Sequence, residues 1–153
     1  MWLPEVMIDR SVYLDANVFI YVFESTLTTQ ITPSRLHKAF QFFQQGRAWA
    51  RTSQLPRAEV LVHPLRQGNA RLTDLYSSLL SGTEIIAVDA VSAAVIDRAA
   101  HLRARHGLRL ADAVHLASAI ESGCDVLLTA DKRLASCRSA SMDILSLDAP
   151  GQP

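Results

Sequence analysis

Four carboxylic acids stand at similar places in the sequence, each just after an apolar run or near the start of a helical segment. Asp15 interrupts "VYLDANVFIYVF" where the apolar residues should continue, and Asp131 follows the apolar run 126–129 by two positions. Glu59 and Asp112 lie on apolar segments with helical spacing. Because an ionised carboxylate is costly to bury without a partner, each of them needs a helix cap, an ion pair or a metal ion.

Taken singly, each acid has an ordinary structural explanation. An Asp between a strand and a helix is most often an N-cap or a first-turn acid that complements the helix dipole. Glu59 can pair with Arg57, Arg66 or another arginine. Caps have no reason to converge on one edge of a sheet, whereas metal ligands do. Carboxylate oxygens are the ligands that Mg²⁺ and Mn²⁺ prefer, and such an ion polarises a phosphoryl oxygen and supplies a water-derived nucleophile.

The elements that must position these acids follow from the alternation of short apolar runs with longer helical segments. This alternation is typical of a parallel sheet covered on both faces. We expect five strands near 12–14, 47–52, 85–88, 126–129 and 144–147, and helices at 15–23, from 33 onward, 53–63, 69–80, 92–107 and 110–123. The predicted fold is a three-layer α/β/α sandwich with a parallel sheet of about five strands, formed by one domain over 1–153. Ligands gather at the carboxyl ends of the strands in such sheets.

Helix boundaries can be predicted from local residue types. Ser53 is a candidate cap for the helix 53–63, and Pro64 is expected to end it. Ser92 is the candidate cap of the helix that stops at Gly107. The helix 110–123 is apolar nearly all round, so we expect it to be buried, with Asp112 unable to reach water.

Composition restricts the class of protein. The chain has 153 residues with 15 basic and 15 acidic side chains, which argues against a general polyanion binder. Setting the four candidate acids aside leaves 15 basic against 11 acidic residues, a mild excess. No signal peptide pattern and no run of about 20 apolar residues is present, which predicts a cytoplasmic protein without a membrane partner. Cys124 and Cys137 fit no Cys-x-x-Cys pattern and are expected to be reduced thiols.

Three stretches together resemble a known family. "VYLDANVFIY", "TSQLPRAEVL" and "LRLADAVHLASAIESGCDVLLTADKRL" are similar, in order and spacing, to the PIN-domain ribonucleases, and most closely to the VapC-type toxins of bacterial type II toxin–antitoxin systems. The resemblance extends from the first predicted strand to the last. Leu134 departs from it, because many relatives have Phe there.

The resemblance implies a metal-dependent endoribonuclease that hydrolyses RNA phosphodiester bonds with Mg²⁺ or Mn²⁺. It implies a homodimer held inactive by a cognate antitoxin. The implied catalytic acids are Asp15, Glu59, Asp112 and Asp131. Of these, Asp15, Asp112 and Asp131 would hold the metal, and Glu59 would be a ligand or orient the water. Asn17 and Thr129 would support the ligands or contact phosphate.

Several readings stay open beside this one. His115, one turn after Asp112, is either a general base or, more commonly on an apolar helix, a hydrogen-bonded core residue. Arg57 either contacts RNA or neutralises the site. A phosphatase with Asp15 as nucleophile is weakened because Asn17 replaces the second Asp that such enzymes use.

A non-catalytic binding module of the same fold is the remaining alternative. Two early helices are rich in aromatic residues, and Phe42 cannot share a helix face with Phe40 and Phe43. This pattern predicts some exposed aromatic surface for a partner.

Overall fold

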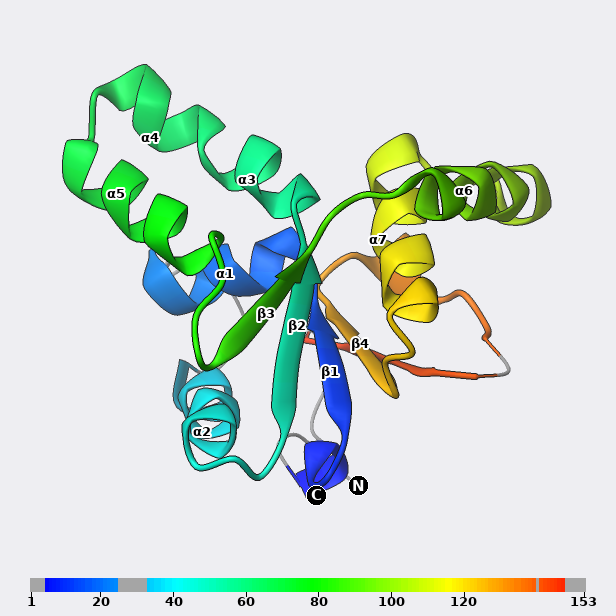
Figure 1. The fold of residues 1–153 in the computed structure, drawn as a ribbon, viewed down its shortest axis with the longest axis horizontal. Coiled ribbons are helices and arrows are strands. Elements are labelled where there is room, and N and C mark those ends of the chain that lie inside the picture. The colour runs from blue at the N-terminus through cyan, green and yellow to red at the C-terminus, as the bar shows by residue number, and fades with distance from the viewer. Residues whose placement is uncertain (1–4, 25–32, 140, 148–153) are drawn as a thin grey trace.

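The protein is described by a computed structural model that covers residues 5–24, 33–139 and 141–147 (Figure 1). Five strands form one sheet in the order β3-β2-β1-β4-β5, and every neighbouring pair is parallel. The strands are β1 (Ser11–Leu14), β2 (Trp49–Ser53), β3 (Ile86–Asp89), β4 (Val126–Thr129) and β5 (Asp143–Ser146). The expected parallel sheet and its strand number are confirmed.

Helices cover both faces of the sheet, as Figure 1 shows. One face carries α1 (Ala16–Phe23), α2 (Pro33–Gln44), α3 (Leu55–Val60), α4 (Val62–Gln67) and α5 (Ala70–Leu79). The other carries α6 (Ala93–His106), α7 (Leu110–Glu121) and the single turn α8 (Lys132–Ala135), and a 3-10 turn, η1 (Glu5–Met7), precedes β1. The three-layer α/β/α prediction is therefore confirmed.

Alternation along the central strand β1 divides the core into two clusters. Val12 and Leu14 pack with α1, α2 and α5, whereas Tyr13 between them packs with α6 and α7. All three are fully buried. Successive strand residues point to opposite faces, so this strand must be apolar at nearly every position, and the single phenol hydroxyl of Tyr13 needs a buried partner.

Two helix boundaries follow the local residue types. The Ser92 hydroxyl accepts a hydrogen bond from the Val95 backbone N–H at 3.2 Å and so caps α6. The same helix ends at Gly107, whose φ of +65° is left-handed and favours glycine.

The predicted helix 53–63 is wrong in its bounds. Ser53 is the last residue of β2, and the chain forms two short helices, α3 and α4, that meet at Leu61. Pro64 lies in the first turn of α4 rather than after a helix. Proline has no backbone N–H, and it is tolerated there because the first N–H groups of a helix form no hydrogen bond within the helix. Glu59 nevertheless lies on the helix after β2, as expected.

Two predictions of exposure are also wrong. Leu110, at the start of the buried helix α7, is 59% exposed, whereas Asp112 in the same turn is 7% exposed. Phe42 is 6% exposed, since it lies under the Arg47 guanidinium, whose central carbon is 4.1 Å from the ring centre. The predicted aromatic surface on α2 therefore loses Phe42. Among the described residues, no helix is long and apolar enough to cross a bilayer.

Candidate functional site

The carboxyl ends of β1 and β4 lie side by side and bring two of the predicted acids to one edge. Asp15 directly follows β1, and Asp131 follows β4 by two residues. Asp15 is only 4% exposed and is the N-cap of α1. Its Oδ1 accepts from the Ala16 backbone N–H at 2.7 Å, and its Oδ2 accepts from the Thr129 hydroxyl at 2.6 Å. The cap explanation is therefore correct for Asp15, and it leaves the carboxylate facing the centre of the edge.

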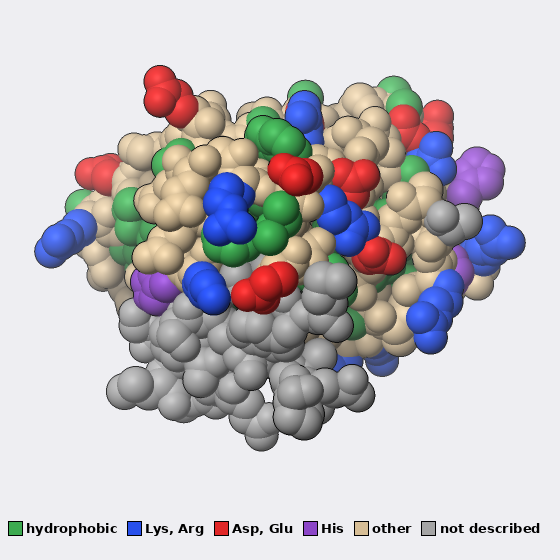
Figure 2. Space-filling view, turned by 90° about the horizontal axis from the view of Figure 1, so that it is seen from below, with side chains coloured by type: hydrophobic (Ala, Val, Ile, Leu, Met, Phe, Trp, Pro, Cys, Tyr) green, Lys and Arg blue, Asp and Glu red, His purple; other side chains and the backbone are tan. Residues whose placement is uncertain are grey.

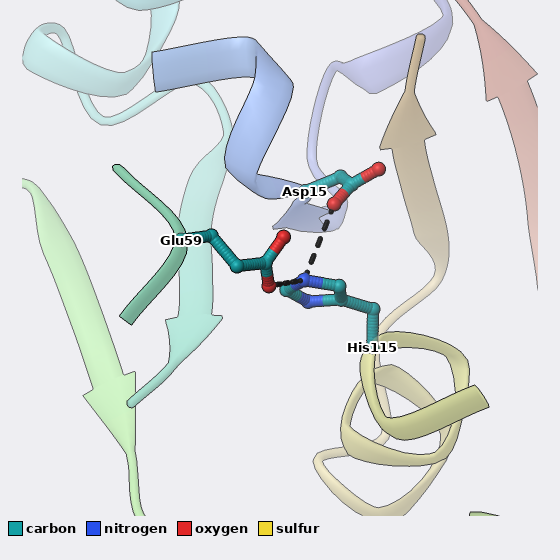
Figure 3. Close-up of side chains that lie close together, drawn as sticks. All are labelled: Asp15, Glu59 and His115. Carbon is teal, nitrogen blue, oxygen red and sulfur yellow. Dashed lines mark hydrogen bonds and ion pairs between the residues drawn. The ribbon is translucent and has the colours of Figure 1, made fainter. Parts of the chain in front are cut away.

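His115 of α7 joins Asp15 to Glu59 of α3. Its Nε2 is 2.6 Å from Glu59 Oε1 and 3.3 Å from Asp15 Oδ1, as the dashed lines in Figure 3 mark. We call Asp15, Glu59 and His115 the inner cluster. Three segments far apart in the chain supply it, and their side chains point toward one another (Figure 3).

The environment of the inner cluster shifts the pKa of both buried members. Burial raises the pKa of Asp15, and the neighbouring His115 and Thr129 offset only part of that effect. Burial alone would lower the pKa of His115, but the hydrogen bond with Glu59 and the charges of Asp15 and Asp112 raise it above the usual value. A positive group is thus favoured between the two carboxylates.

The Tyr13 hydroxyl, which is hydrogen-bonded to Ser53, holds the other nitrogen of the His115 ring. Its Nδ1 is 2.8 Å from the Tyr13 hydroxyl, and that hydroxyl donates to Ser53 Oγ at 2.9 Å. With the phenol proton directed to Ser53, the phenol oxygen accepts from Nδ1–H, while Nε2–H faces carboxylates that can only accept. This arrangement favours the protonated ring, because both of its N–H groups then have acceptors.

Asp112 and Asp131 form a different arrangement around Arg109. Arg109 Nε donates to Asp112 at 3.1 Å, and its Nη2 donates to Asp131 at 2.8 Å. We call Asp112, Asp131 and Arg109 the outer cluster. The Arg109 side chain is 65% exposed, whereas those of Asp112 and Asp131 are 10% and 18% exposed.

Thr129 connects the two clusters. It donates its hydroxyl proton to Asp15, and the same oxygen accepts from the backbone N–H of Asp131 at 2.9 Å. Asp131 is also the N-cap of α8, accepting from the backbone N–H groups of Arg133 and Leu134. Because α8 is only one turn long, sequence periodicity did not indicate it.

The remaining predicted residues lie as follows. Asn17 is exposed on the first turn of α1, and within the described residues its side chain forms no hydrogen bond with any of the four acids. Arg57 is turned away from the site, where it donates to the Ser77 carbonyl and the Ser81 hydroxyl. Sequence reasoning missed Tyr13 and Ser53, although a tyrosine inside an otherwise aliphatic buried strand signals a hydrogen-bond partner nearby.

The donor set of the inner cluster fits a divalent cation. Asp15, Glu59 and, once its Nε2 has lost the proton, His115 each offer a ligand atom, and these atoms lie within 4.8 Å of one another. The described part of the chain contains no other group of three such side chains at this spacing. Two carboxylates with an imidazole suit Mn²⁺ and related ions, and carboxylates suit Mg²⁺. A cation here would also relieve the cost of burying Asp15.

Comparison with known proteins identifies the family. The family model described as PIN domain matches residues 12–138. No curated protein sequence matches the chain.

Solved structures of similar fold include examples from three organisms. A toxin–antitoxin complex from Klebsiella pneumoniae is 20% identical with a TM-score of 0.63, covering 89% of this chain and 97% of its own. VapBC2 from Rickettsia felis, bound to a DNA fragment from its promoter, is 14% identical with a TM-score of 0.63, covering 89% and 98%. FitAcB from Neisseria gonorrhoeae is 15% identical with a TM-score of 0.62, covering 89% and 97%. At these identities the likeness establishes the fold.

Proposed function

The chain belongs to the PIN-domain family, and from this membership we propose that it is a Mg²⁺- or Mn²⁺-dependent endoribonuclease and the toxin of a toxin–antitoxin pair. The observation that carries the proposal is the meeting of four acids from four separate segments at the carboxyl edge of β1 and β4. Two of them, Asp15 and Glu59, lie at ligand spacing together with His115. PIN domains are typically metal-dependent nucleases, which agrees with this acidic edge.

The residues of this edge have different proposed roles. Asp15, Asp112 and Asp131 would hold the metal, with Glu59 as a further ligand or as the base that orients the attacking water. When bound, the ion polarises a phosphoryl oxygen and lowers the pKa of a coordinated water. Thr129 fixes the orientation of the Asp15 carboxylate through its 2.6 Å hydrogen bond.

His115 holds Glu59 in place and keeps a proton between it and Asp15. Since its other nitrogen is tied to Tyr13, the ring cannot turn without breaking a buried hydrogen bond. The two sequence-based readings of His115 are thus not exclusive: it is a hydrogen-bonded core residue that also touches the proposed metal ligands. Arg109, exposed beside Asp112 and Asp131, is placed to contact an RNA phosphate when a metal takes over those acids.

The proposed partners are RNA, a cognate antitoxin and a second copy of this chain. The structural neighbour from Klebsiella pneumoniae is a toxin–antitoxin complex, which supports an antitoxin partner. The homodimer rests on the family resemblance.

The two rival functions gain nothing from the geometry. A phosphatase with Asp15 as nucleophile lacks its second acid, because Asn17 stands at that position and is exposed on the first turn of α1. A binding module based on exposed α2 aromatics is weakened because Phe42 and Phe43 are buried.

The test is cleavage of total RNA by the purified protein with Mg²⁺, with Mn²⁺ and with a chelator. An Asp15→Ala variant is compared with Asp97→Ala, which removes an exposed carboxylate on α6. We expect discrete fragments that require both the metal and Asp15, with full activity in Asp97→Ala. Circular dichroism of each variant shows that it is folded. Equal cleavage by folded Asp15→Ala protein, or cleavage that survives the chelator, would contradict the proposal.

A further inference from the structure

A cavity lined by basic side chains lies on the flank of the outer cluster. It has a volume of about 530 Å³ and is formed by the end of α6, the turn after it, and the segment that follows Asp131. We call it the basic pocket. Its lining includes His106, Leu108, Arg133, Ser136, Cys137 and Arg138.

The two arginines of the basic pocket have no carboxylate partner among the described residues, as is also true of the exposed Arg66, Arg71 and Arg105. Arg10, Arg51 and Arg98 each pair with a carboxylate. In contrast, Arg133 and Arg138 are exposed, and their guanidinium groups form no ion pair or hydrogen bond with any described residue. Because these two guanidinium groups have no carboxylate partner within the described residues, they are available to bind an anion from outside the protein.

The local charge also differs from the charge of the whole chain. The chain is neutral overall, but the segment 132–138, "KRLASCR", contains three basic residues and no acid. Figure 2 shows Lys, Arg and His side chains gathered at the end of the molecule where Figure 1 places α6. Overall neutrality therefore hides a positive region suited to a polyanion.

Both walls of the basic pocket are close in the chain to residues of the proposed catalytic edge. Arg133 follows Asp131 by two residues, and its backbone N–H donates to Asp131 Oδ1 at 2.8 Å. On the opposite wall, Leu108 adjoins Arg109, which donates to Asp131 Oδ2 at 2.8 Å. Burial raises the pKa of the Cys137 thiol, and the charges of Asp112 and Asp131 add to this effect, so the thiol lies within the field of those acids.

The chemistry of the basic pocket matches a phosphodiester. Guanidinium groups donate paired hydrogen bonds to phosphate oxygens, and His106 adds a further ring nitrogen. We infer that the basic pocket binds a backbone phosphate of single-stranded RNA, next to the phosphate that is hydrolysed. The inference rests on the proposed function. RNA is the occupant that the proposed function supplies at this edge, and an acidic polypeptide is the alternative that the test below separates from it.

The test measures binding separately from cleavage. The probe is a fluorescein-labelled single-stranded RNA of about 12 nucleotides, followed by fluorescence anisotropy in chelator at several KCl concentrations. The pocket variant is Arg133→Ala/Arg138→Ala. Its matched control is Arg66→Ala/Arg71→Ala, which removes the same charge from exposed arginines on α4 and α5, at the far end of the molecule in Figure 1.

We expect the pocket variant to bind RNA about tenfold more weakly and to reduce the slope of log K against log salt by about 0.7, the contribution of one single-strand phosphate contact. The control should change neither quantity by a comparable amount. With Mg²⁺ or Mn²⁺, the pocket variant should raise KM for cleavage and leave kcat unchanged. If melting shows that the pocket variant is unfolded, Arg133→Gln/Arg138→Gln takes its place.

The inference is contradicted if the pocket variant binds RNA as tightly as wild type, or if the pocket variant and the control lose RNA binding equally. It is also contradicted if polyglutamate binds the wild type as tightly as RNA does and binds the pocket variant more weakly. Failure of the proposed function looks different. A protein that binds RNA through Arg133 and Arg138 but cleaves none with either metal keeps the basic pocket and contradicts the nuclease.

Discussion

The inner and outer clusters solve the same electrostatic problem in different ways. Each brings two carboxylates together and places one cation from the α7 region between them. In the inner cluster the cation is His115, which is 1% exposed and is held from behind by Tyr13. In the outer cluster it is Arg109, whose side chain is 65% exposed.

This difference separates a fixed part of the edge from an exchangeable one. Moving His115 would leave buried polar groups without partners, at a cost of roughly 1–3 kcal/mol for each group. Moving Arg109 only returns an exposed guanidinium to water, and surface pairs of this kind contribute little. The inner cluster is therefore already organised for a ligand, whereas the outer cluster can release its cation when a metal or a phosphate arrives.

Removing the cation of the inner cluster should have the largest effect. His115→Ala leaves Glu59 unanchored and Asp15 buried without its neutralising partner, so we expect a loss of about 3 kcal/mol in the free energy of unfolding. Unlike a guanidinium, the His115 Nε2 can ligate Mn²⁺ once it has lost its proton, so affinity for Mn²⁺, measured by calorimetry, and the rate of RNA cleavage should each fall on the order of 10- to 100-fold. His63→Ala, an exposed position on α4, is the control and should behave as wild type. Unchanged metal affinity in folded His115→Ala protein would show that the inner cluster is only structural.

Weakening the support behind His115 should have an intermediate effect. Tyr13→Phe removes the hydroxyl between His115 and Ser53 and should lower the free energy of unfolding by about 1–2 kcal/mol, measured by urea denaturation. Its matched control is Tyr76→Phe, which removes another buried hydroxyl that donates to Glu24 at 2.6 Å. Both variants should lose stability, but only Tyr13→Phe should lower kcat for RNA. A similar loss of kcat in both would assign the effect to stability alone.

Removing the cation of the outer cluster should have a smaller effect and the opposite sign on metal binding. Arg109→Ala removes a positive charge that competes with a metal for Asp112 and Asp131, so Mn²⁺ should bind more tightly, while RNA binds more weakly. Calorimetry with Mn²⁺ and anisotropy with RNA measure the two directions. Arg105→Ala, an exposed arginine of α6, is the matched control. Weaker Mn²⁺ binding in Arg109→Ala would mean that Arg109 positions the acids rather than competing for them.

The ion pair between Arg51 and Asp89 lies away from the edge and serves as a comparison, because we expect it to affect stability and not RNA cleavage. Arg51 donates to both oxygens of Asp89, at 2.6 and 2.9 Å, and this hydrogen bonding is the main reason that the pKa of Asp89 lies below its usual value. An acid whose folded pKa is lowered stabilises the protein above its unfolded pKa, and that contribution disappears as the pH falls through the folded pKa.

Asp89→Asn should therefore be less stable than wild type at neutral pH. We expect its free energy of unfolding to be lower by less than about 1 kcal/mol, because both partners are partly exposed. The difference should shrink as the pH falls below about 4, where an ordinary Asp takes up its proton, and should vanish below the folded pKa of Asp89. Melting curves across this pH range provide the measurement, and RNA cleavage near neutral pH should be unaffected. A difference that stays constant down to the lowest pH would show that the charge of Asp89 is not what stabilises the pair.

Much of the fold could be predicted from the sequence because its signals are local. Alternating apolar runs and helical segments gave the five parallel strands, and Ser92 and Gly107 marked the ends of α6 correctly. The failures occurred where tertiary packing overrides local residue types. Pro64 did not end a helix, because the chain had already bent at Leu61 and restarted in α4.

The sequence by itself determined which acids were costly to bury, since Asp15 and Asp112 interrupt segments that are otherwise apolar. It also determined the order of strands and helices along the chain, and hence the edge at which Asp15 and Asp131 meet. Only the tertiary structure decided how these acids are neutralised. Tyr13 lies 102 positions from His115, and Glu59 lies 56 positions from it, so no local pattern connects them. Packing α7 against the sheet brings His115 between the two acids, because a buried carboxylate is stable only beside a group that carries or shares its charge.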